Sequence, residues 1–105
     1  MANTLNRLES IIKERRVADP ALSYIAKLFS RGRETIAQKV GEEATETVIA
    51  AIIGDPAKLT SEAADLIFHL MVLLEEGGVC MDDVLAELDR REGLSGLAEK
   101  ASRTE

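Results

Sequence analysis

The chain has 105 residues, of which 46% are hydrophobic and 30% charged, and these values fit a single globular domain. Aromatic residues make up only 3%, and there is no tryptophan to serve as a stacking platform for single-stranded nucleic acid. The formal net charge of −6 also argues against attraction to a phosphate backbone, so we expect no nucleic-acid partner.

The first third of the chain predicts two short helices. The first runs from Thr4 to Arg16 and places four apolar residues near one face, Leu5, Leu8, Ile11 and Ile12. Pro20 prevents this helix from continuing, and the stretch from Ser23 to Ser30 predicts the second helix. Gly32, between two arginines, predicts a sharp break after it.

Two long helices joined by a short turn are predicted next. The first runs from about Glu34 to Ile53, and Gly54 can adopt the left-handed conformation just past its last turn. Asp55 is a good cap for the following helix, and Pro56 fits its first position. That helix continues to about Glu76 and ends at a pair of glycines. Because the turn is short, the two helices should pack antiparallel.

The remaining residues predict one more helix and a tail. Asp82 and Asp83 favour a helix start, and the pattern continues to about Arg91. No segment alternates apolar and polar residues with turn residues at its ends, as a strand would. We therefore predict an all-α bundle of about four to five helices. Residues 1–105 form one domain in this interpretation, with a core over about 4–92 and a flexible tail over 93–105.

The segment from Leu66 to Leu74 is apolar on all sides of its helix, and such a helix must be buried all round. A single chain of this size would struggle to cover it, so we predict a homodimer or higher oligomer with this helix at the interface. The segment is too short to span a bilayer, and no apolar run of signal-peptide type begins the chain. Cys80 is the only cysteine. We therefore expect a cytoplasmic protein without a membrane partner.

Acidic residues gather on facing sides of the two long helices. On the first, Glu42, Glu43 and Glu46 share one face with Lys39, although like charges at this spacing repel. On the second, Glu62 and Asp65 lie among leucines. Counted from Gly54, the pair Glu43 and Glu46 stands at a similar height to the pair Glu62 and Asp65. Four carboxylates around one point would make an all-oxygen site suited to Mg²⁺ or Mn²⁺.

Each of these residues also has a simpler interpretation. A lone pair of glutamates three residues apart on a helix is usually solvated surface. Glu42 could be a solvated neighbour of the ligands, and Lys39 could simply pair with Glu43 one turn away. His69 could be a metal ligand, but we expect a core histidine bonded to a neighbouring group. Tyr24 could be a packing residue.

Four sequence blocks resemble one known family. They are SYIAKLFSRG (23–32), QKVGEEATE (38–46), SEAADLIFHLMVLL (61–74) and MDDVLAELDRR (81–91). Together they resemble the phosphoribosyl-ATP pyrophosphohydrolases, which belong to the MazG-type all-α nucleotide pyrophosphohydrolases. The resemblance implies a MazG-like bundle completed by dimerisation. It also implies Mg²⁺-dependent attack of water on the α–β anhydride of phosphoribosyl-ATP, giving phosphoribosyl-AMP and pyrophosphate in the second step of histidine biosynthesis.

The resemblance also implies roles for individual residues. The metal ligands would be Glu43, Glu46, Glu62 and Asp65, with Glu46 also counted as catalytic. Glu42 would be a general base or a further ligand, and Lys39 would contact phosphate. Ser23, Tyr24 and Lys27 would line the substrate pocket. Where the family leads us to expect a lysine, this chain has Thr35, and Arg31 or Arg33 could replace that contact.

Two alternative functions stay open at this point. One is hydrolysis of other nucleoside or deoxynucleoside triphosphates by the same kind of site. The other is a non-catalytic helical dimerisation module whose acidic residues are only surface.

Overall fold

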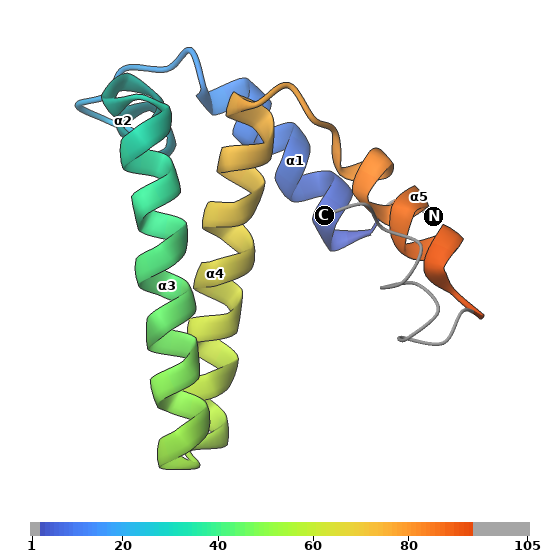
Figure 1. The fold of residues 1–105 in the computed structure, drawn as a ribbon. Helices are drawn as coiled ribbons and strands as arrows, with labels where there is room; N and C mark the ends of the chain where they lie inside the picture. The colour runs from blue at the N-terminus through green and yellow to red at the C-terminus, as the bar shows by residue number, and fades with distance from the viewer. Residues whose placement is uncertain (1–2, 94–105) are drawn as a thin grey trace.

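The computed structural model describes residues 3–93, which form five helices and no strand (Figure 1). The helices are α1 (Thr4–Arg15), α2 (Tyr24–Arg31), α3 (Arg33–Ile53), α4 (Pro56–Glu76) and α5 (Met81–Arg91). The all-α prediction is therefore confirmed, and each predicted helix is present to within two residues. The predicted tail lies outside the described residues from position 94 onward.

The α3–α4 hairpin is the longest feature of the molecule and projects from the other three helices (Figure 1). Gly54 lies between its two helices with φ 84°, in the left-handed region, and its N–H donates to the carbonyls of Ala50 and Ala51. The Asp55 carboxylate accepts the N–H groups of Ala57 and Lys58. The turn thus forms as its sequence predicts, and the two helices run antiparallel.

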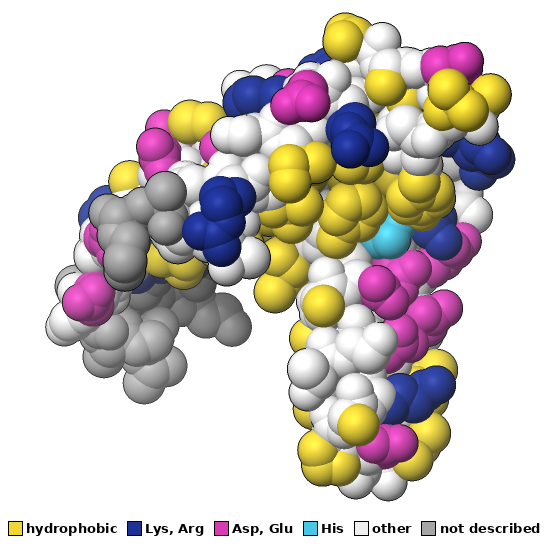
Figure 2. All heavy atoms as spheres, turned by 180° about the vertical axis from the view of Figure 1, so that it is seen from behind, with side chains coloured by type: hydrophobic (Ala, Val, Ile, Leu, Met, Phe, Trp, Pro, Cys, Tyr) yellow, Lys and Arg dark blue, Asp and Glu magenta, His cyan; other side chains and the backbone are white. Residues whose placement is uncertain are grey.

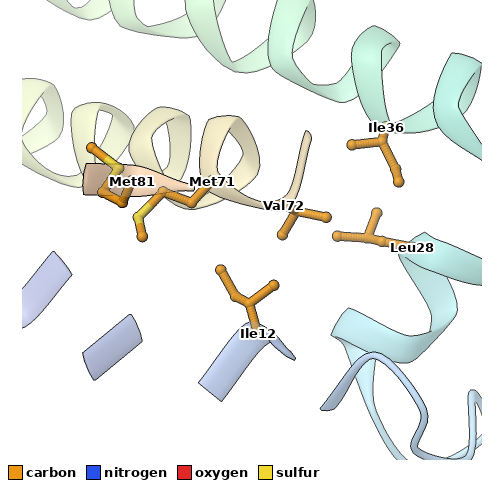
Figure 3. Close-up of a cluster of buried hydrophobic side chains, with 6 residues drawn as sticks. All are labelled: Ile12, Leu28, Ile36, Met71, Val72 and Met81. Atoms are coloured by element: carbon orange, nitrogen blue, oxygen red, sulfur yellow. The ribbon is translucent and has the colours of Figure 1, made fainter. Parts of the chain in front are cut away.

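The hydrophobic core lies at the open end of the hairpin, where α1, α2 and α5 join it. Six buried side chains from all five helices point toward one another there (Figure 3): Ile12, Leu28, Ile36, Met71, Val72 and Met81. Burying a side chain of this size stabilises the fold by about 1.5–3 kcal/mol relative to leaving it exposed. This core fixes α2 next to the open end of the hairpin.

Ion pairs support the same end of the molecule. Lys13 of α1 lies 2.7 Å from Glu75, and Arg16 contacts both Glu75 and Glu76 at the end of α4. The Arg16 guanidinium also stacks over the Phe29 ring, at 4.7 Å from its centroid. The last helix begins at Met81, one residue before its predicted start, and its first N–H donates to the Glu9 carboxylate at 2.7 Å.

The single chain leaves apolar surface on the hairpin uncovered. Ile67 of α4 is 45% exposed and Ile52 of α3 is 80% exposed. The sequence predicts that a single chain cannot cover the apolar segment from Leu66 to Leu74 on all sides. The exposure of Ile67 within this segment agrees with that prediction. No helix within residues 3–93 is long and apolar enough to cross a membrane.

Candidate active site

Three acidic side chains from the facing sides of α3 and α4 converge. Glu43 of α3 and the residues Glu62 and Asp65 of α4 each offer a carboxylate oxygen, and these oxygens lie within 4.8 Å of one another. Figure 2 shows acidic side chains gathered on one side of the hairpin, next to the histidine. Glu43, Glu62 and Asp65 stand at similar heights above the turn, and three of the four predicted carboxylates therefore meet at one point.

Glu43 is the buried member of this group. Its residue surface is only 7% exposed, and its Oε2 atom has no hydrogen-bond partner in the structure. A buried carboxylate oxygen without a partner is costly, because it has lost water and gained nothing in return. A divalent cation held between the three carboxylates would satisfy it. The donor set, made of oxygens alone, fits a hard ion such as Mg²⁺ or Mn²⁺.

Glu46 lies beside this cluster and not within it. Its side chain is exposed, but its carboxyl group is within hydrogen-bonding reach of Glu62. The pKa of Glu62 is raised above 4.5, first by burial and then by the hydrogen bond and the charge of Glu46. The two residues border a shallow hollow together with Ile49 and Lys58. An ion held by the three carboxylates and a group bound in this hollow would both lie close to Glu46.

Lys39 supplies positive charge at the opposite side of the cluster. Its Nζ atom lies 3.4 Å from Glu42 Oε1 and 3.7 Å from Glu43 Oε1. Burial lowers the pKa of Lys39, but the hydrogen bond to Glu42 and nearby negative charge outweigh it, so the pKa lies above 10.5. Lys39 is thus a fixed cation, and Glu42 is held by it and by Gln38. Both residues remain at the surface, where a substrate could reach them.

Comparison with known proteins places the chain in a family. Residues 5–92 match the family described as Phosphoribosyl-ATP pyrophosphohydrolase. The chain belongs to this family. A phosphoribosyl-ATP pyrophosphatase of Rhizorhabdus wittichii is 67% identical to it, over 98% of this chain and 97% of the relative. Proteins of the same name from Novosphingobium aromaticivorans and Methylococcus capsulatus are 65% and 54% identical, over 95% and 96% of this chain and 94% and 96% of each relative.

The single histidine of this phosphoribosyl-ATP pyrophosphohydrolase family member is a core residue. His69 is 5% exposed, its Nδ1 lies 2.8 Å from the backbone carbonyl of Asp65, and its Nε2 lies 2.8 Å from the Tyr24 hydroxyl. Both ring nitrogens are engaged, which confirms the expectation of a core histidine bonded to a neighbour. The sequence did not pair it with Tyr24, because the two residues are 45 positions apart.

The predicted substrate-binding residues of α2 and its flanks lie in different settings. Ser23 caps α2, since its hydroxyl oxygen accepts the Ala26 N–H at 3.2 Å. Lys27 and Arg31 are exposed on α2. Arg33 lies 3.1 Å from Glu76, at the end of α4. Glu76 is eleven residues past Asp65, or about 16 Å along the helix, so Arg33 is engaged far from the acidic cluster.

A pH titration of the metal-free protein tests the Glu62 environment. A raised pKa means that the folded protein holds the Glu62 proton more tightly than the unfolded chain. Its contribution to stability is therefore fully present below pH 4.5 and is lost as the pH rises through the raised value. We expect Glu62→Gln to remove this loss, so that the free energy of unfolding in urea and EDTA falls less between about pH 4 and about pH 7. If the free energy of unfolding falls equally with pH in the variant and in wild type, Glu62 is not raised in pKa by burial and by Glu46.

Proposed function

We propose that this chain hydrolyses phosphoribosyl-ATP to phosphoribosyl-AMP and pyrophosphate, the second step of histidine biosynthesis. Family membership and relatives named for this activity over nearly the whole chain support the proposal. The observation that carries it is the convergence of Glu43, Glu62 and Asp65 around a buried carboxylate oxygen that lacks a partner. A surface patch without function would have no reason to bury Glu43 in this way.

In the proposed mechanism Glu43, Glu62 and Asp65 would hold Mg²⁺, and Glu46 would be a further ligand through its place next to Glu62. The ion, when bound, neutralises charge on the phosphate oxygens and stabilises the leaving pyrophosphate. Through this ion, the carboxylates would hold an anionic substrate that their own negative charge would otherwise repel.

The remaining residues act on water and phosphate. Glu46 or Glu42 accepts the proton of the water that attacks the α–β anhydride, since both are exposed carboxylates next to the cluster. Lys39 stays cationic and binds phosphate, and Lys27 and Arg31 add positive charge from α2. Arg33 is the weaker of the two arginine candidates, because Glu76 already holds it.

A second copy of the chain completes the molecule in this proposal. The exposed apolar residues of the hairpin, such as Ile52 and Ile67, would be covered by the same surface of a partner. Sedimentation at micromolar concentration should give at least a dimer, whereas a monomer alone would contradict it. A cytoplasmic location stays a prediction from the sequence.

A substrate panel tests the proposed activity against both alternatives. Pyrophosphate release is measured with phosphoribosyl-ATP, dCTP, dUTP and ITP in the presence of Mg²⁺. We expect kcat/KM for phosphoribosyl-ATP to exceed that for the others by about 100-fold or more. A preference for one of the other triphosphates would favour the wider nucleotide hydrolase function. No release from any of them would favour a non-catalytic module.

A further inference from the structure

Tyr24 and His69 form a hydrogen-bonded bridge between α2 and the acidic helix α4. A backbone carbonyl only accepts hydrogen bonds, so the 2.8 Å contact with Asp65 places a proton on His69 Nδ1. In the neutral ring Nε2 is then an acceptor, and the Tyr24 hydroxyl donates to it at 2.8 Å. The Tyr24 hydroxyl proton is thereby committed to this bond.

Ring packing fixes the orientation of the two side chains that form this hydrogen bond. The Tyr24 ring stacks on Phe68 with centroids 6.2 Å apart, and Phe68 meets His69 edge-on at 5.0 Å. His69 is nearly buried, so its ring cannot turn to another partner without losing these contacts. The bridge is therefore a built feature of the interface between α2 and α4.

The core holds the inner face of α2, and the bond from Tyr24 to His69 ties its adjoining face to α4. The helix follows a non-helical segment, residues 16–23, and ends at Gly32 with φ 92°. Leu28 and Ala26 bury its inner face. By their spacing, Tyr24, Lys27 and Arg31 share the adjoining face. Because Tyr24 is held to His69, one turn past Asp65, this bond sets where the cations of α2 stand relative to the acidic cluster.

We propose that Tyr24 and His69 are positioning residues, whose hydrogen bond holds the basic face of α2 in register with the metal-binding side of α4. This inference rests on the proposed function, and it replaces a direct contact between the Tyr24 hydroxyl and substrate. The bridge orders α2 before the substrate arrives, so that Lys27 and Arg31 meet its phosphates without a further ordering cost.

Four variants separate positioning from direct contact. Tyr24→Phe removes only the hydroxyl, and His69→Asn keeps a donor for the Asp65 carbonyl while removing the acceptor for Tyr24. His69→Gln carries an oxygen that can accept from Tyr24. We expect the first two to raise KM for phosphoribosyl-ATP about tenfold with little change in kcat, and His69→Gln to stay near wild type. The double variant Tyr24→Phe/His69→Asn should be no worse than either single variant.

Matched measurements identify the failures. Ser30→Ala removes another hydrogen bond of α2, from its hydroxyl to the Lys27 carbonyl, and should leave KM unchanged. Mn²⁺ affinity should be the same in all variants. Multiplying losses in the double variant would show that Tyr24 contacts the substrate by itself, and a lowered melting temperature with unchanged KM would show a purely structural bond. Either result overturns the positioning proposal but leaves the proposed function standing. A wild-type protein that is inactive on phosphoribosyl-ATP would overturn both.

Discussion

Replacing Glu43 with glutamine should lower kcat/KM for phosphoribosyl-ATP by about 1,000-fold or more. The amide keeps the size of the side chain but removes the charge that an ion needs between Glu62 and Asp65. Since Glu43 is 7% exposed, water cannot easily take over this role. The metal-free variant should fold at least as well as wild type, because one of three crowded negative charges is gone.

Three readouts separate these effects. Pyrophosphate release gives kcat/KM, Mn²⁺ titration gives the metal affinity, and urea unfolding in EDTA gives the stability. Glu34→Gln is the matched control, since Glu34 is exposed in the first turn of the same helix and should behave as wild type. Turnover of the Glu43 variant close to wild type would remove Glu43 from the metal site.

Glu46→Gln should reduce kcat to about 1% of the wild-type value or less, while the helical content stays intact. Glu46 borders the hollow next to Glu62 and is exposed, so its loss acts on the reaction and not on the core. If Glu46 accepts the proton of water, kcat falls and the Mn²⁺ affinity is kept. If it is mainly a ligand, both fall together.

Glu42→Gln completes this comparison. Glu42 is held by Lys39 and Gln38 and is not one of the three converging residues, so we expect a smaller loss than for Glu46. A larger loss in the Glu42 variant, with normal metal affinity, would instead make Glu42 the general base. Circular dichroism of both variants serves as the folding control.

The hairpin could be predicted because its determinants are local. Gly54, Asp55 and Pro56 follow one another and specify the end of one helix and the start of the next. The last helix shows the limit of such signals. Its first N–H donates to Glu9, 72 positions away, and no local pattern reveals a cap supplied from another helix.

Part of the candidate site was equally accessible to sequence reasoning. Helix spacing and a short turn were enough to bring Glu43 toward Glu62 and Asp65. They could not show that Glu43 is the buried residue or that Glu46 lies at the edge, because burial depends on how α3 and α4 rotate against each other. The bond between Tyr24 and His69 joins residues 45 positions apart on α2 and α4, and no local sequence pattern reveals such a pairing.

We propose that Glu43, Glu62 and Asp65 together bind a divalent cation. The direct test is a crystal of the protein grown with Mn²⁺ and measured at the manganese absorption edge. The account predicts an anomalous peak bonded to oxygens of all three carboxylates, at about 2.0–2.3 Å. Carboxylates that stay apart, with the manganese bound elsewhere or nowhere, would contradict it.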